Sequence, residues 1–126
     1  MKAFNTLVRA DLAAGKAAGW LDIDLSTVVP VGKRLVIEYV STSAEMPPGQ
    51  KPNPVLVVVD KNGSAVVQHY PVSNYQLQYA GSDIYKSADS VKMILARNLT
   101  LRVDMTRDQT AGEARCYFGI SGYVTD

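Results

Sequence analysis

From Trp20 onward, short apolar or alternating segments recur along the chain, and turn-forming residues separate them. These segments follow one another roughly every 8–12 residues, a spacing typical of all-β domains. Alternation indicates that one face of a strand meets a core while the other meets water, as in antiparallel sheets. We therefore predict a single all-β domain over residues 1–126. Its expected architecture is a two-sheet antiparallel β-sandwich, jelly-roll-like, of about eight to ten strands.

Individual segments differ in how deeply they should be buried. Residues 20–29 alternate in polarity, whereas residues 34–41 are apolar on both faces and should form a central strand. The Asp-Lys-Asn-Gly-Ser sequence at 60–64 separates two valine-rich runs, which predicts a hairpin. Residues 43–54 contain four prolines and are expected to form a loop, because proline cannot donate to a sheet ladder. Further strands are expected at residues 75–80, 91–96, 99–106 and 113–125.

The last two of these segments allow a more specific prediction. If residues 107–112 form a connecting loop, Thr106 lies opposite Glu113, Asp104 opposite Arg115, and Arg102 opposite Tyr117. A shift of one residue would bury the charged side chains, so the pattern favours this register. The same register sends the apolar side chains inward: Leu101, Val103, Met105, Cys116, Phe118 and Ile120.

The first 19 residues fit two descriptions. Leu7, Leu12 and the alanines that follow could form a short helix, but Gly15 and Gly19 weaken it. Alternatively, residues 4–8 form an edge strand followed by a loop of small residues. We favour the strand.

Composition and charge exclude several classes of function. Thirteen Lys and Arg against twelve Asp and Glu give a net charge of +1, so no concentrated basic surface is expected to bind nucleic acid. No stretch approaches the roughly 20 apolar residues that span a bilayer, and Arg9 and Asp11 interrupt any run resembling a signal peptide. We therefore expect neither a nucleic-acid nor a membrane partner, with the cytoplasm as the default location.

No catalytic residues, metal site or cofactor are predicted. His69 is the only histidine, and a lone histidine cannot assemble a zinc site. The single cysteine, Cys116, falls on an inward face, which is typical of an inert buried thiol. Asp22 and Asp24 point the same way on one strand, and a carboxylate site would need a neighbour such as Glu38. A solvated polar face explains these carboxylates as well as an active site does.

The segment most suggestive of binding is residues 68–85, which contain four of the seven tyrosines together with several amides. Tyrosine combines a rigid apolar face with a hydroxyl, and amides both donate and accept hydrogen bonds, a mixture found in recognition surfaces. The alternative is that Tyr75, Leu77 and Tyr79 enter the core. The candidate ligand-binding residues are Tyr70, Tyr75, Gln76, Gln78, Tyr79 and Tyr85.

Two runs carry a resemblance to known proteins. Residues 29–41 (VPVGKRLVIEYVS) and 118–124 (FGISGYV) resemble motifs of small bacterial β-sandwich proteins of uncharacterised function. This resemblance implies a fold and no activity. Residues 116–120 (CYFGI) are similar to the last strand of the tumour-necrosis-factor and C1q jelly rolls, which implies oligomerisation.

Three functions remain open at this point. The first is a non-enzymatic structural or self-assembling module, expected to be a homo-oligomer because a nearly neutral sandwich must hide or pair its sheet edges. The second is a carbohydrate- or small-ligand-binding module that uses residues 68–85 and Trp20. The third is an enzyme with a dispersed carboxylate site.

Overall fold

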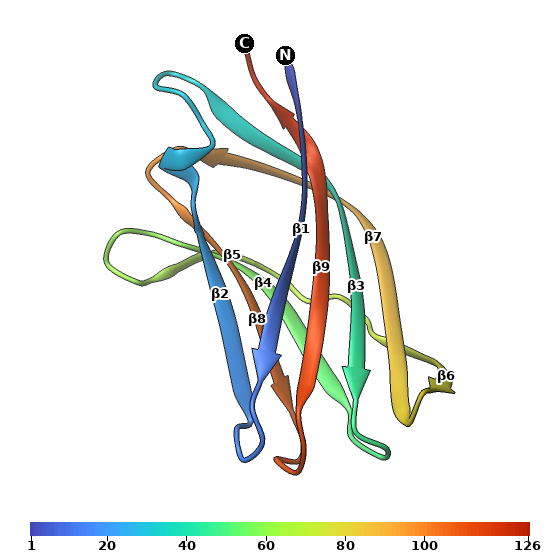
Figure 1. The fold of residues 1–126 in the computed structure, drawn as a ribbon. Coiled ribbons are helices and arrows are strands. Elements are labelled where there is room, and N and C mark those ends of the chain that lie inside the picture. The colour runs from blue at the N-terminus through green and yellow to red at the C-terminus, as the bar shows by residue number, and fades with distance from the viewer.

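The computed structural model describes all residues from 1 to 126, and they fold into nine strands in two antiparallel sheets (Figure 1). The all-β sandwich expected from the sequence is thereby confirmed. A three-residue 3-10 helix, η1 (Leu25–Thr27), follows the second strand. No helix is long and apolar enough to cross a membrane. The five-stranded sheet has the order β1 (Lys2–Leu12), β9 (Ala114–Val124), β3 (Arg34–Met46), β7 (Ser82–Ala96) and β6 (Asn74–Tyr79). The four-stranded sheet has the order β2 (Ala18–Asp24), β8 (Thr100–Arg107), β4 (Pro52–Val59) and β5 (Ala65–His69).

The strand order is that of a jelly roll with one added strand. Without β6, the remaining strands pair as a long antiparallel hairpin that has been rolled up: β1 with β9, β2 with β8, β3 with β7, and β4 with β5. Contacts of β3 with β9 and of β4 with β8 then complete the two sheets. This rolled arrangement matches the predicted fold class.

The core lies between the two sheets and is built mainly from the inward faces of β3, β8 and β9, with further side chains from β1, β4 and β7. The apolar side chains predicted to point inward from β8 and β9 are all buried. Cys116 is among them, and burial raises the pKa of its thiol to about 12. It is therefore a packed, protonated thiol at neutral pH.

The pairing predicted between the last two segments is wrong. β8 and β9 belong to different sheets, so Thr106 and Glu113, Asp104 and Arg115, and Arg102 and Tyr117 are not cross-strand neighbours. The six-residue connection arches from one sheet to the other instead of forming a hairpin. In the observed register, Asp104 lies opposite Trp20 and Val55, and Arg115 lies opposite Asp11 and Glu45.

The proline-rich segment is also more ordered than expected. β3 continues to Met46 and β4 begins at Pro52, so only residues 47–51 form the predicted loop. Pro52 and Pro54 fit in a strand because this part of β4 pairs with β8 alone, and β5 pairs only from Leu56 onward. The missing proline N–H groups therefore need not donate to a second neighbour.

The other local predictions fared better. The N-terminal segment is a strand at the edge of the five-stranded sheet, and it extends well beyond residues 4–8. Residues 60–64 form the β4–β5 hairpin, in which the Asp60 carboxylate accepts hydrogen bonds from the N–H groups of Asn62 and Ser64. The strand expected over residues 20–29 ends earlier, at Asp24, whose side chain caps η1.

One buried arginine ties together the three loops at the lower end of Figure 1. Arg107 closes β8 and is 7% exposed, and no carboxylate pairs with its guanidinium. Its hydrogen bonds reach the β1–β2, β3–β4 and β8–β9 loops. The acceptors are the carbonyls of Ala13, Lys16, Thr110, Ala111 and Gly112 and the side-chain oxygen of Gln50, at 2.8–3.2 Å.

A second arginine, Arg97, binds loop carbonyls at the opposite end of the sandwich. Arg97 donates to the carbonyls of Ser26 and Val29 at 3.1 and 2.9 Å, which anchors η1 to the β7–β8 turn. Each end of the sandwich therefore has an arginine that satisfies loop carbonyls.

We expect Arg107→Lys to lower the free energy of unfolding by about 2–4 kcal/mol, because an ammonium with three donors cannot reach six acceptors spread over three loops. Arg34→Lys is the matched control, since its exposed side chain makes no hydrogen bond or ion pair, and it should change stability by less than about 0.5 kcal/mol. Urea unfolding followed by circular dichroism measures both. Equal effects of the two substitutions would show that Arg107 does not organise the loops.

Candidate functional site

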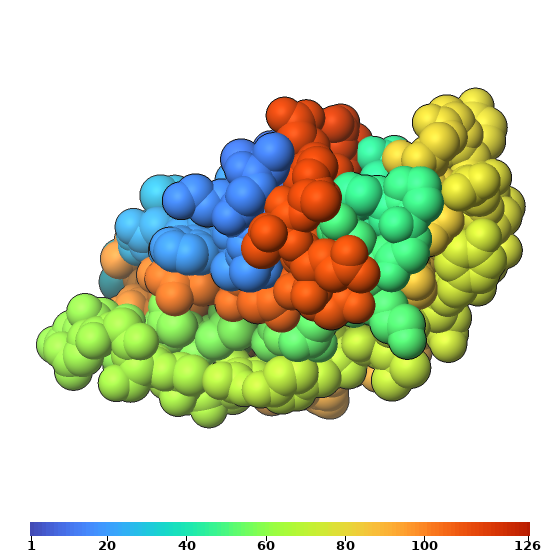
Figure 2. All heavy atoms as spheres, turned by 90° about the horizontal axis from the view of Figure 1, so that it is seen from below, coloured from blue at the N-terminus to red at the C-terminus, as the bar shows by residue number.

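The outer face of the five-stranded sheet is low in its middle because small side chains occupy it. Alternation along β3 and β9 sends their large apolar residues inward and leaves Ser41, Ser43, Gly119 and Ser121 facing outward. Ser41 lies opposite Gly119, where an added Cβ would lie 2.6 Å from the Ser41 hydroxyl oxygen. Seen along the strands, this face dips over β3 between β9 and the β6–β7 hairpin (Figure 2).

The dip contains a hollow of about 490 Å³. Ser41, Ser43 and Gly119 contribute to its floor, Gln76 and Lys86 line the side toward β6, and Leu7 and Tyr117 line the side toward β1. Hydroxyl and amide groups thus face an open space with apolar and aromatic surfaces beside it.

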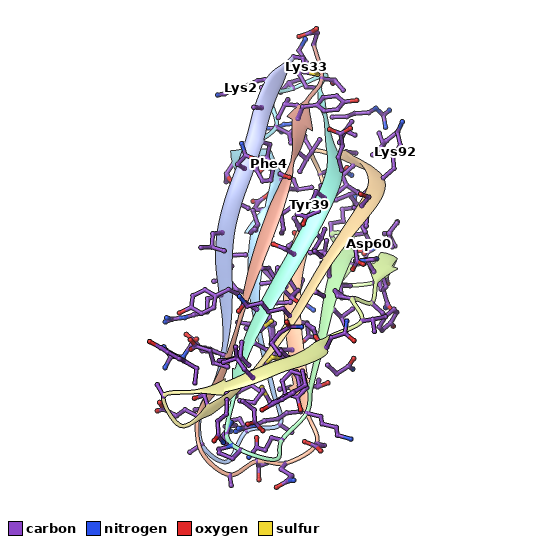
Figure 3. All side chains as sticks on the ribbon, turned by 90° about the vertical axis from the view of Figure 1, so that its right-hand side faces the viewer. Lys2, Phe4, Lys33, Tyr39, Asp60 and Lys92 are labelled. Carbon is purple, nitrogen blue, oxygen red and sulfur yellow. The ribbon has the colours of Figure 1, made fainter.

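Two further hollows continue the first one in opposite directions. One of about 380 Å³ shares Ser43, Gln76 and Lys86 with it and reaches Leu77 and Tyr79 on β6. The other, of about 390 Å³, shares Leu7, Ser41 and Gly119 with it and reaches Asn5 on β1 and Tyr39 on β3. Figure 3 shows Tyr39 near the middle of this sheet. We call the three connected hollows the sheet groove; it crosses the strands from β6 to β1.

Most charges around the sheet groove are neutralised by neighbours. Arg115 lies 3.3 Å from the Glu45 carboxylate, and Arg9 lies 2.7 Å from that of Asp11. The Arg9 guanidinium also lies 5.9 Å from the centre of the Tyr117 ring, and hydrogen bonds to Tyr117 and Asp11 raise its pKa. Lys86 lines two of the hollows and makes no ion pair, so it is the one unpaired charge in the groove.

The carboxylates considered for catalysis do not gather in one place. Asp22 forms a two-pronged ion pair with Arg102, at 2.7 and 3.1 Å. Asp24 caps η1, and hydrogen bonds from Ser26 lower its pKa. Glu38 belongs to β3 in the other sheet, at a bulge, so it does not neighbour the two aspartates. No group of three or more His, Cys, Asp or Glu side chains is arranged to hold a metal ion.

The structure separates the six residues predicted to bind a ligand. Gln76 and Tyr79 line the sheet groove, and Tyr79 is 71% exposed. Tyr75, Gln78 and Tyr85 lie on the opposite face of the β6–β7 hairpin. Tyr75 pairs with Tyr85, and the next pair along, Leu77 with Ile84, lines the groove; Gln78 lies between Leu77 and Tyr79, which also line it. Tyr70 stands apart on the connection from β5 to β6, where its hydroxyl donates to the Gln68 side chain.

Tyr75 and Tyr85 form an edge-to-face pair whose ring centres are 5.6 Å apart. Tyr85 also packs against the main core, and burial raises its pKa above 10.0. The alternative that Tyr75, Leu77 and Tyr79 enter the core is wrong, since every residue of β6 is exposed. This segment projects at one side of the molecule, in yellow in Figure 2.

Trp20, the other aromatic residue considered for binding, lies far from the sheet groove in the fold. It belongs to β2 in the four-stranded sheet, where the Arg102 guanidinium lies 5.6 Å from its ring centre. Its ring therefore already contacts a cation of the same chain, the Arg102 guanidinium.

Several residues of the sheet groove were not anticipated from the sequence: Leu7, Ser41, Ser43, Lys86, Tyr117 and Gly119. The available signal was the outward row of small residues on two segments. Recognising it required knowing that β3 and β9 are neighbours, with Ser41 beside Gly119 and Ser43 beside Tyr117.

No protein-family model and no curated protein sequence matches the chain. Among solved structures, it is similar to the VP2 subviral particle of infectious bursal disease virus, with 7% identity and a TM-score of 0.47. That match covers 97% of this chain and 32% of VP2, so the chain spans about a third of the viral protein. A carbohydrate-binding module of the β-sandwich superfamily matches with 13% identity and a TM-score of 0.39, covering 100% of this chain and 55% of that one. Likenesses this distant assign no function to the chain.

The two faces of the β6–β7 hairpin should respond differently to truncation. We expect Tyr85→Ala to lower the free energy of unfolding by about 2–3 kcal/mol through lost packing, and Tyr79→Ala to change it by less than about 0.5 kcal/mol. Because the folded state raises the pKa of Tyr85, stability should also fall above pH 10.0, and Tyr85→Phe should reduce that fall. Urea titrations at neutral and alkaline pH provide both measurements. A larger loss from Tyr79→Ala than from Tyr85→Ala would contradict the assignment of the faces.

Proposed function

We propose that the chain is a binding module whose sheet groove takes an extended and largely uncharged polar chain, and that carbohydrate is the class of ligand that fits best. The observation that supports this is the lining of the groove. Hydroxyl and amide side chains face the same open space as exposed tyrosines at its two ends, Tyr39 and Tyr79.

The chemistry of a sugar ring matches this lining. A pyranose presents an apolar C–H face, which packs on an aromatic ring, and a rim of hydroxyls, which both donate and accept hydrogen bonds. Gln76 and the neighbouring Asn74 offer both donors and acceptors, and Ser41 and Ser43 add hydroxyls. The groove has a single unpaired cation, Lys86, and no concentrated basic surface, which favours a largely neutral ligand over a strongly acidic one.

The shape of the groove favours a chain over a compact molecule. Small ligands bind in concave pockets that enclose most of their surface. The sheet groove instead crosses five strands on the outer face of the sheet. An oligosaccharide would contact several hollows in turn, and each sugar would contribute a modest affinity.

A glycan array of neutral and acidic oligosaccharides, followed by calorimetry on the best neutral oligosaccharide, tests this proposal. We expect Gln76→Ala and Tyr79→Ala each to weaken binding at least tenfold, about 1.4 kcal/mol, without changing the thermal midpoint. Tyr70→Ala is the matched control, because Tyr70 is an exposed tyrosine like Tyr79, 60% exposed, but lies outside the groove. An equal loss in all three variants, or no binding to any neutral oligosaccharide, would contradict the proposal.

Self-assembly is a second candidate function, and the state of the sheet edges favours it. Each sheet ends in two strands that have a partner on one side only, namely β1 and β6 in one sheet and β2 and β5 in the other. Unpaired N–H and C=O groups along such edges can bind another strand. The net charge of +1 opposes association only weakly.

We expect light scattering coupled to size-exclusion chromatography at micromolar concentrations to give a mass that is a multiple of 13.7 kDa. A single species of 13.7 kDa across that range would rule out self-assembly as a function of the isolated chain.

A further inference from the structure

The four edge strands differ in how well they are protected against pairing. β6 has six residues and a register shift between Tyr75 and Leu77, and β5 has five residues with a shift beside Val59. β2 has only seven residues, and two of them are aspartates. Short length, bulges and charges are the features that keep sheet edges from aggregating.

β1 lacks the first two of these protections, and its charged residues, Lys2, Arg9 and Asp11, lie toward its two ends. It runs for eleven residues without proline or glycine, and it pairs with β9 without any shift in register. β2 covers only its last part, where the backbone of Gly19 packs so closely that a Cβ there would collide with the Asp11 carbonyl. The segment from Lys2 to Arg9 therefore presents an open edge, at one margin of the sheet in Figure 3.

An exposed leucine lies in the middle of this edge strand. Leu7 is 70% exposed on the outer face of the sheet, between Asn5 and Arg9. Edge strands that remain unpaired commonly carry a charged residue such as lysine at such a position, because the charge blocks pairing with another strand. A large apolar side chain there does not block pairing.

We propose that a second copy of this chain pairs with β1, antiparallel and about a two-fold axis, so that two five-stranded sheets become one ten-stranded sheet. This inference rests on the second candidate function, self-assembly, and specifies its surface. An antiparallel strand pairs with its own copy through a closed two-fold contact, so the assembly stops at two chains.

The charges along β1 favour this arrangement with the axis at Thr6. In that register Asn5 of one copy faces Leu7 of the other, Ala3 faces Arg9, and Phe4 faces Val8. Each side chain thereby stays on its own face of the sheet, as the two-residue period requires. Lys2 and Arg9 lie on opposite faces, so no cation lies opposite another.

The same contact would join the two sheet grooves. Asn5 and Leu7 line the end of the groove that reaches β1, so the grooves of the two copies would meet at the axis. The dimer would then present one continuous polar surface twice as long as that of a single chain.

Sedimentation equilibrium over a concentration series tests the inference. The wild-type chain should reach twice 13.7 kDa, and the Asn5→Lys/Leu7→Lys variant should weaken the dimer at least tenfold by placing cations opposite each other. The Asn5→Lys/Leu7→Glu variant places opposite charges across the same contacts and should recover the dimer. Val66→Lys, at an exposed position on β5, is the matched control and should leave association unchanged.

The outcomes separate the two levels of the inference. A wild-type chain that stays monomeric contradicts self-assembly as a whole. A dimer that persists in Asn5→Lys/Leu7→Lys places the interface on another surface, which overturns the role of β1 and leaves self-assembly standing. Because Asn5 and Leu7 are both exposed, each variant should keep the fold, and thermal unfolding checks this.

Discussion

The lower end of the sandwich depends on a single buried cation. Nine strands can pack a core by alternation alone, but three adjacent loops also leave carbonyl groups that turn away from water and need donors. Arg107 provides the donors from one planar group, and Gln50 links to it and to the Ala111 carbonyl. A carboxylate partner is unnecessary because several aligned carbonyl dipoles surround the charge. The loops at this end are thereby held in fixed positions relative to one another, and so are the strands that enter them.

The candidate site follows from how the five-stranded sheet is built above this support. A jelly roll needs four strands in each sheet, and the added β6 makes one sheet wider than the other. The extra strand has no core to cover, so its side chains stay exposed and form a wall beside the low middle of the sheet. Small residues such as Ser41 and Gly119 keep that middle open. The groove therefore results from unequal sheet width combined with small outward side chains, and it needs no separate cavity in the core.

Much of the fold could be predicted from the chain, but partners and registers could not. Alternation assigns faces, so the inward positions of Met105 and Phe118 were predicted correctly. It gives no information on which strand lies beside which, and a six-residue connection can close a hairpin or cross between sheets. Arg115 was therefore paired with Asp104 instead of with Asp11 and Glu45. The candidate site was harder to predict than the fold, because its floor joins residues that lie far apart in sequence. The role of Arg107 could not be predicted either, because no motif distinguishes it from a surface arginine.

The rolled-hairpin topology also bears on how the chain reaches its native state. The hairpin around Asn62 brings together residues that are close in sequence, and each further pair, β3 with β7, β2 with β8 and β1 with β9, closes a longer loop. Loop-closure entropy grows with length, and domains dominated by such distant pairs fold slowly. Folding that proceeds from the middle outward leaves β1 as the last strand to dock. Until it does, the edge of β9 stays open, and during synthesis β1, which is made before the other eight strands, must wait for β9.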